Sequence, residues 1–316
     1  MTEARKIYKQ ADPPHPNGKR KKDRGSFLAV TATALEMRAV LAALPGGSDI
    51  NIAEYSILIP QDQTRPALPA LRLAEHDLAI LICGVGPVAA ALTLGFYLGV
   101  RQDEGQGKTL DGVINFGFAG SYDLERAPEG ALVLVDAETF PEYGVWPESG
   151  EHSPAGANTC GNTPKQYRDD LPQPGFPLPL PLPQTRLERG PIFTRIDLEP
   201  DQALAAMGLC LGKQEKNRHN GKNFISAAPT LSGAAATLSG VSGTPRRAAR
   251  MAALSGALVE NMEGFALAMA CAAAGIAFIE LRAVSNAAGK RPPQGWDFTA
   301  AGATLSRAAV RLLGRV

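Results

Sequence analysis

The segment at 258–289, LVENMEGFALAMACAAAGIAFIELRAVSNAAG, constrains the fold of this chain more than any other. It is almost entirely apolar or small, as expected for a helix and a strand in a protein core, but it contains four charged residues. These are Glu260, Glu263, Glu280 and Arg282. Because a charge removed from water is costly unless it is paired or hydrogen-bonded, such residues belong to a functional site or to its support.

Short apolar runs alternate with helical patterns along much of the chain. Strand-like runs are predicted at 27–33, 78–83, 111–121, 131–138 and 276–285. Helical spacing of apolar residues is found at 34–44, 88–100, about 262–274 and 299–314. Asn261 is placed to cap the third of these helices, and Gly275 to end it. Strands that alternate with helices imply an α/β fold.

Three segments do not fit this alternation. Residues 1–25 carry eight Lys or Arg against three acids, which predicts a solvated, disordered basic tail or, alternatively, a docking arm. The interval at about 141–200 holds 12 of the 25 prolines and is interpreted as a long loop or insertion in a single domain spanning 26–316. Recognition of this interval by another protein domain is the alternative. The small-residue stretch at 226–244 is interpreted as a mobile loop that borders a pocket.

The overall composition argues against several classes of partner. The net charge of +1 gives no indication of nucleic-acid binding, and no apolar run is typical of a membrane span. Cysteines and histidines are dispersed, so we expect no metal, no cofactor and free thiols in a cytoplasmic protein. They are Cys83, Cys160, Cys210, Cys271, His15, His76, His152 and His219. Neither a GxxxxGK[ST] loop nor a dinucleotide fingerprint is present, which disfavours nucleoside triphosphates and NAD.

Glycine turns and polar residues stand at the ends of four predicted strands, at 32–36, 83–86, 116–120 and 285–289. In open α/β sheets, ligands bind beyond the carboxyl ends of the strands, where glycine lets the backbone approach a substrate. The candidates for substrate contact at these turns are Gly84, Phe118, Ala119, Gly120 and Ser285. Glu263 lies in the first turn of its helix, where the helix dipole favours a carboxylate. Taken alone, it could be an ordinary polar residue of a helix.

Five motifs in this order resemble those of the purine nucleosidases of the nucleoside phosphorylase superfamily. They lie at Ala32–Glu36, Cys83–Gly86, Ile114–Gly120, Glu260–Gly264 and Arg282–Asn286. The forms VENMEG and LRAVSN are most similar to the futalosine hydrolases, which release hypoxanthine in menaquinone biosynthesis. The resemblance implies a three-layer α/β/α sandwich with a central mixed sheet. It also implies hydrolysis of a small-molecule purine nucleoside by a homodimer or higher homo-oligomer.

The resemblance further implies roles for individual residues. Glu36 stands where the family has its water-activating carboxylate, and Glu263 where it has the acid that binds the ribose hydroxyls. Met262 takes the place of the methionine packed against the sugar, and Asn286 that of an aspartate in adenine-specific relatives. We therefore expect Glu36, Glu263 and Asn286 to be catalytic, with Met262 and Asn261 contributing to substrate binding. The other charged residues of the opening segment are interpreted as structural supports: Glu260, Glu280 and Arg282.

The asparagine at position 286 bears on which purine is bound. Adenine presents an acceptor at N7 beside an amino donor, whereas hypoxanthine presents acceptors at both N7 and O6. The NH₂ group of Asn286 offers two donors and therefore favours a 6-oxopurine, although the amide could also be oriented to serve adenine. Phe118 and Phe224 are the candidates for stacking on the base.

Three other functions remain open. A methylthioadenosine/adenosylhomocysteine nucleosidase would use the same residues on an adenine nucleoside. A phosphorolytic nucleoside phosphorylase would need Arg and Ser on the first two strand-end loops, which read TATALE and CGVGP with no basic residue before Arg38. A non-catalytic nucleoside-binding protein would bind the ligand without cleaving it.

Overall fold

A mixed β-sheet is the centre of the computed structural model, which describes residues 24–52, 68, 70–103, 110–144, 194–211, 230–291 and 295–314. Its nine described strands are β1 (Gly25–Thr31), β2 (Ala70–Arg72), β3 (His76–Ile82), β4 (Gly112–Ser121), β5 (Leu132–Thr139), β6 (Arg195–Asp197), β7 (Thr230–Thr237), β8 (Val259–Asn261) and β9 (Phe278–Ala287). The helices are α1 (Ala34–Leu41), α2 (Pro87–Asp103), α3 (Pro200–Ala206), α4 (Pro245–Ser255), α5 (Gly264–Ala274) and α6 (Phe298–Leu313), with a 3-10 turn at Gly47–Asp49.

The last strand, β9, lies at the centre of the sheet. One half of the sheet runs in the order β2-β3-β1-β4, and β9 pairs in parallel with β4 and antiparallel with β5. From β5 the strands β7 and β8 lead back to the end of β4, so this half of the sheet closes on itself. Because β1, β3, β4 and β9 are parallel, their carboxyl ends reach the same edge. The four expected segments therefore reach the same edge, although 116–120 belongs to β4 and 285–287 to β9, so these residues are strand and not turn.

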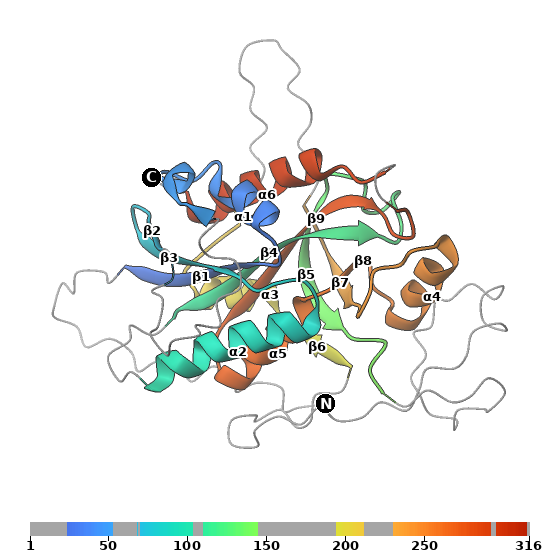
Figure 1. Ribbon diagram of the computed structural model, residues 1–316, viewed down its shortest axis with the longest axis horizontal. Coiled ribbons are helices and arrows are strands. Elements are labelled where there is room, and N and C mark those ends of the chain that lie inside the picture. Colours follow the sequence, from blue (N-terminus) through green and yellow to red (C-terminus); the bar gives the residue numbers. More distant parts are fainter. Residues whose placement is uncertain are drawn as a thin grey trace, which may run out of the picture.

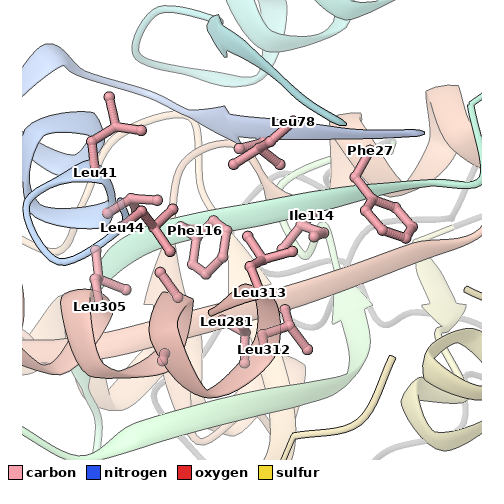
Figure 2. Close-up of a cluster of buried hydrophobic side chains, with 14 of the residues drawn as sticks. Phe27, Leu41, Leu44, Leu78, Ile114, Phe116, Leu281, Leu305, Leu312 and Leu313 are labelled. Carbon is pink, nitrogen blue, oxygen red and sulfur yellow. The ribbon is translucent and has the colours of Figure 1, made fainter. Parts of the chain in front are cut away.

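Helices cover both faces of the sheet, which confirms the expected three-layer arrangement (Figure 1). The helices α1 and α6 pack together on one face, over a core that includes Phe116, Leu281 and Leu305 (Figure 2). The helices α2 and α5 pack together on the other face, where Leu94 and Leu267 belong to a second apolar cluster. Burial of apolar side chains on both faces holds the sheet rigid beneath its ligand-binding edge.

Capping residues set where two helices at this edge begin. Thr33 and Glu36 form a reciprocal capping box at the start of α1. The helix α5 begins at Gly264, two residues later than expected, because Asn261 still belongs to β8. The Asn261 side chain nevertheless satisfies the helix start, since its Oδ1 accepts from the N–H groups of Glu263 and Gly264. Gly275, at φ 68°, ends α5 as expected.

The interpretation of 226–244 as a mobile loop is wrong at its centre. Thr230–Thr237 forms β7, which pairs in parallel with both β5 and β8. The small residues serve close packing, since a Cβ on Gly233 would lie 3.0 Å from Leu258 Cδ2. The helix α4, capped by the Thr244 side chain, follows shortly after and is an element that the sequence pattern did not predict.

Two further expectations fall largely on residues that the structure does not describe. The basic tail is described only from residue 24, and the Pro-rich interval only at 141–144 and 194–200. The tail, the insertion and the single-domain organisation therefore stay predictions. Within the described ranges, no helix combines the length and apolar character needed to cross a membrane.

Candidate active site

Glu36 lies in the first turn of α1, directly after β1, and three donors hold its carboxylate. Oε2 accepts from the backbone N–H (2.9 Å) and the hydroxyl (2.7 Å) of Thr33, and Oε1 accepts from the N–H of Phe118 on β4 (2.9 Å). Glu36 is buried, with 5% of its surface exposed. An ionised carboxylate has about four acceptor positions, so one remains for a water molecule or a substrate group.

Glu263 lies at the N-terminus of α5, and its two carboxylate oxygens have different partners. Oε1 accepts from the backbone N–H of Gly86 at 2.9 Å, and Oε2 lies 3.7 Å from Nη1 of Arg282. The Gly86 N–H reaches this position because Gly84 and Gly86 both adopt positive φ, 84° and 97°, which other residues rarely tolerate. Burial raises the pKa of Glu263, and the positive charge of Arg282 opposes that shift.

Arg282 on β9 is fully buried and lies between the carboxylates of the site. Its Nε donates to Oε1 of Glu280 at 2.6 Å, and its Nη1 lies 3.4 Å from the Phe118 carbonyl oxygen. A Cβ on Gly117 would overlap Nη1 of Arg282 and would lie 3.4 Å from Oε1 of Glu36. The guanidinium thus occupies the space that Gly117 leaves open, beside both Glu36 and Glu263. Arg282 was expected to be a support for the site, and the structure places it among the predicted reactive groups.

Asn286 lies near the end of β9, opposite Gly120 of β4, and its amide is oriented by two neighbours. The hydroxyl of Ser285 donates to Oδ1 at 2.7 Å, and Nδ2 donates to the Ala287 carbonyl at 2.8 Å. A flipped amide would place Oδ1 against that carbonyl oxygen, which repels another acceptor. One N–H of Asn286 is therefore engaged within the protein, and one remains to donate to a ligand.

The apolar candidates lie on the segments that carry these polar residues. Met262 is half-buried, and its Cε lies 4.0 Å from the position of a Cβ on Gly86. Phe118 is half-buried and its ring lies 5.3 Å from that of Phe298, which in turn contacts Trp296 at 5.5 Å. The Ala119 carbonyl lies 3.3 Å from the Ser285 hydroxyl. Phe298 and Trp296 were not singled out in the sequence, and Phe224 lies outside the described residues.

Asn261 and Glu260 direct their side chains into the protein. Asn261 is 3% exposed, and its amide donates to Glu138 and accepts from the hydroxyl of Thr237 in addition to capping α5. Glu260 accepts from the hydroxyl (2.6 Å) and the N–H (2.9 Å) of Ser242, and burial raises its pKa. The hydrogen bonds of both side chains hold neighbouring segments in place, which is the supporting role expected of Glu260.

The chain matches known proteins over most of its length. A model of the phosphorylase superfamily matches residues 70–316. A futalosine hydrolase from Streptomyces coelicolor is 32% identical over 289 residues, which cover 90% of this chain and 94% of that protein. A futalosine hydrolase from Thermus thermophilus is 49% identical over 232 residues, which cover 73% of this chain and 78% of that protein. The chain belongs to the futalosine hydrolase family of this superfamily.

A solved structure supports the fold of this futalosine hydrolase family member. A 5′-methylthioadenosine/S-adenosylhomocysteine nucleosidase from Colwellia psychrerythraea, crystallised with adenine, superposes with a TM-score of 0.56. The alignment covers 93% of this chain and 98% of that chain at 19% sequence identity. At this identity the likeness establishes the nucleosidase-like fold alone.

Two further contributors to the site escaped the sequence patterns. Gly86 supplies the N–H that holds Glu263, and the motif at 83–86 contained it without showing which glycine would matter. Glu138, near the end of β5, has no exposed surface and has hydrogen-bond partners in Thr237 and Asn261. In the sequence, Glu138 was recognisable only as a carboxylate near the end of an apolar strand. This pattern did not predict proximity to Glu280, because β5 runs antiparallel to β9.

We predict that Gly264→Ala destabilises the protein, because a Cβ at this position would overlap Oε1 of both Glu138 and Glu280. Overpacking of this kind typically costs about 1–3 kcal/mol, measurable as a lower midpoint of chemical denaturation. The matched control is Gly302→Ala in α6, where the added Cβ would meet only Ala39 Cβ at 3.5 Å. The control should be neutral or gain up to about 1 kcal/mol. Equal stability of the two variants would contradict the tight packing at Gly264.

Proposed function

We propose that this chain hydrolyses the N-ribosidic bond of futalosine and releases hypoxanthine. The observation that carries the proposal is the relationship to two futalosine hydrolases over most of the chain. The geometry supports it, because Glu36, Glu263 and Asn286 stand at one edge of the sheet on three different elements. A nucleoside needs three kinds of contact at such an edge: one for the attacking water, one for the sugar and one for the base.

Glu263 is suited to the sugar. A carboxylate accepts two hydrogen bonds from a ribose diol, and among the described residues Oε2 of Glu263 is paired with Arg282 alone, at 3.7 Å. Arg282 favours the ionised form that acceptance requires. Met262 lies beside Gly86, close enough to pack against the same sugar ring.

Glu36 is suited to activating water. Its free acceptor position can take a proton from water as the water oxygen attacks C1′ of the ribose. The N-ribosidic bond breaks in an oxocarbenium-like transition state, and its electrons leave with the purine. The proton that Glu36 has taken from water then passes through solvent to the purine anion, which gives neutral hypoxanthine and restores the Glu36 carboxylate. The nearby Arg282 guanidinium can stabilise the negative charge on Glu36 before the transfer. The logic is that of inverting glycosidases, with an amide in place of the acid that assists departure.

Asn286 is suited to the departing base. Its free N–H can donate to N7 or O6 of hypoxanthine, where negative charge develops as the bond breaks. Ser285 and the Ala287 carbonyl orient the amide so that a donor faces the base without any change in protonation. The half-buried ring of Phe118 lies on the strand paired with β9 and is the described candidate for contact with the purine.

The other candidate functions have less support. An adenine nucleoside needs an acceptor for its amino group, and the oriented Asn286 amide offers a donor. A phosphorylase needs free cationic groups for phosphate, whereas Arg282 is committed to Glu280 and Glu263. The deciding experiment incubates the protein with futalosine, inosine, methylthioadenosine and adenosylhomocysteine, with and without phosphate, and identifies the base that is freed. Phosphate-independent release of hypoxanthine from futalosine is expected, and dependence on phosphate would exclude hydrolysis.

We further propose that a second copy of this chain covers α2. Four apolar side chains at helical spacing are exposed at the start of this helix: Val85, Val88, Leu92 and Phe96. Val88 is the most exposed of them, at 79%. An exposed apolar stripe of this kind marks an association surface. The stripe begins beside Gly86, which contacts Glu263, so a partner seated on it would border the proposed sugar site. That continuity with the site favours another copy of the same chain.

We predict that Glu36→Gln binds futalosine but hydrolyses it about 10²–10⁴-fold more slowly, because the amide cannot take the proton from water. The measurement is single-turnover release of hypoxanthine, with ligand binding checked by calorimetry. The control is Glu125→Gln, an exposed glutamate for which no change is expected. Turnover by Glu36→Gln close to that of the parent protein would remove Glu36 from this role.

We predict that Asn286→Asp lowers kcat/KM for futalosine relative to methylthioadenosine. A carboxyl group at this position offers one donor only when protonated, and its other oxygen suits an adenine amino group. Losing one hydrogen bond to the transition state corresponds to about tenfold. The ratio of the two kcat/KM values is the quantity to measure. An unchanged ratio would refute the interpretation that Asn286 favours a 6-oxopurine over adenine.

We predict that the double substitution Val88→Glu and Leu92→Glu converts the oligomer to a monomer, because charges in an apolar interface are poorly tolerated. Light scattering coupled to size exclusion reports the mass. Val310→Glu, on the exposed face of α6, is the control and should leave the assembly intact. A parent protein that is monomeric at micromolar concentration would overturn the proposal.

A further inference from the structure

A buried carboxyl group, Glu138, lies directly behind the proposed sugar-binding residue. It comes from β5 and has no exposed surface. Its Oε1 accepts from the Asn261 amide at 2.6 Å, and its Oε2 lies 2.9 Å from the Thr237 hydroxyl. The space beside Gly264 brings Oε1 of Glu138 and Oε1 of Glu280 together, since one added Cβ would overlap both. Two carboxyl oxygens therefore approach each other in the interior.

The charged residues around Glu138 would not compensate a negative charge on its carboxyl group. Arg282 pairs with Glu280 at 2.6 Å and reaches Glu263 at 3.7 Å. No ion pair joins Glu138 to any of the described residues. Ionisation of Glu138 would add a second negative charge beside Glu280, away from water, and a buried unpaired charge of this kind is strongly disfavoured.

The single hydroxyl hydrogen of Thr237 also argues against an ionised Glu138. Its hydroxyl accepts from the N–H of Phe265 at 2.8 Å, and it has a single hydrogen to donate. Two oxygens compete for that hydrogen: Oε2 of Glu138 at 2.9 Å and Oδ1 of Asn261 at 3.1 Å. If Oε2 of Glu138 carries a proton and donates it to Thr237, the Thr237 hydrogen is free for Asn261. Every one of these short contacts then has a hydrogen between its two atoms.

We propose that Glu138 is a neutral carboxylic acid in the native protein and that this acid positions Glu263. The acid donates to Thr237, Thr237 donates to Asn261, and Asn261 accepts from the N–H groups of Glu263 and Gly264. These bonds fix the first turn of α5 and therefore the direction of the Glu263 side chain. Glu138 touches no reacting group and is a positioning residue. Its link to catalysis rests on the proposed function, whereas its protonation does not.

The neighbouring charges support this assignment from each element that packs around Glu138. Burial is the main cause that raises the pKa of Glu138, the negative charge of Glu280 raises it further, and Arg282 opposes the shift. Glu263 lies at the start of α5, beyond Arg282. On β6 the residue opposite Glu138 is the apolar Ile196, and the flanking Arg195 and Asp197 pair with each other in solvent. From β7 and β8 the side chains that contact Glu138 are the uncharged Thr237 and Asn261.

The first test is the pH dependence of stability in Glu138→Gln, an isosteric variant that is always neutral. Because the folded-state pKa of Glu138 is raised above its ordinary value, the folded protein keeps a proton that the unfolded chain releases above about pH 4.5. Wild-type stability therefore falls as pH rises from there toward the folded-state pKa. The difference in Tm, variant minus wild type, should grow by about 2 °C per pH unit over that range.

The slope of this Tm difference against pH, and not the absolute value of the difference, tests whether Glu138 is protonated. A difference that is flat or that falls with pH would show that Glu138 is ionised when folded and would overturn the proposal. The matched variant is Glu280→Gln, which removes the partner of Arg282 and should lower Tm across the same pH range. An infrared difference spectrum of wild type minus Glu138→Gln should also contain the carbonyl stretch of a protonated acid. Its absence would equally contradict a neutral Glu138.

The positioning role is tested by activity. Glu138→Gln should retain kcat/KM for futalosine within about threefold, because the Gln amide can donate to Thr237 as the acid does. Glu138→Ala leaves Asn261 and Thr237 without this partner and should lose at least about tenfold. Similar losses in both variants would show that the charge, not the neutral group, is required. If wild type does not cleave futalosine, the proposed function fails while the stability slope still reports on Glu138.

Discussion

The buried guanidinium of Arg282 is the interaction on which the rest of the polar core depends. It is 1% exposed, pairs closely with Glu280 and lies beside Glu263 and Glu36. Breaking a buried pair by removing one partner typically costs about 3–5 kcal/mol, because the remaining charge is left without compensation. A single strand, β9, carries both this cation and Asn286. The apolar layers that cover β9 therefore hold Arg282 at fixed distances from the glutamates. Because these glutamates need a counter-charge, the side chain at position 282 cannot be replaced freely.

Much of the fold could be predicted from hydrophobic patterning. The strands β1, β3, β4, β5 and β9 and the helices α1, α2, α5 and α6 were all visible as apolar runs or helical spacing. The strand β7 was not, because TLSGAAAT contains small residues whose role is to let Leu258 and its neighbours approach closely. Low side-chain volume is ambiguous in a sequence, since it is equally typical of a loop. Only the neighbouring strands show that these residues are packed.

The candidate site was predictable to the extent that it depends on strand ends. Glu36 follows β1 and Asn286 lies near the end of β9, which both run parallel to β4, so their common edge could be inferred from the strand order. Glu263 follows the short strand β8, which is antiparallel to β4, and only the family resemblance indicated its place. The orientation of the Asn286 amide could not, because it depends on the Ser285 hydroxyl and the Ala287 carbonyl in three dimensions. Nor could the position of Glu138, because antiparallel pairing between β5 and β9 is not encoded in the spacing of either strand. Asn261 satisfies the start of α5 as predicted, and its assignment as a substrate contact stays a prediction.

The central position of β9 has a consequence for synthesis of the protein. A nascent chain that has emerged only as far as α5 already contains Glu36 and Glu263, but it has neither the guanidinium of Arg282 nor a strand to fill the gap between β4 and β5. The sheet can close only by threading a late segment between two early ones, and such non-local pairing is intrinsically slow. Until then Glu36 and Glu263 lack Arg282, the neighbour that lies beside both of them at this edge. The three predicted catalytic residues Glu36, Glu263 and Asn286 therefore come together only after β9, one of the last elements of the chain, has been synthesised.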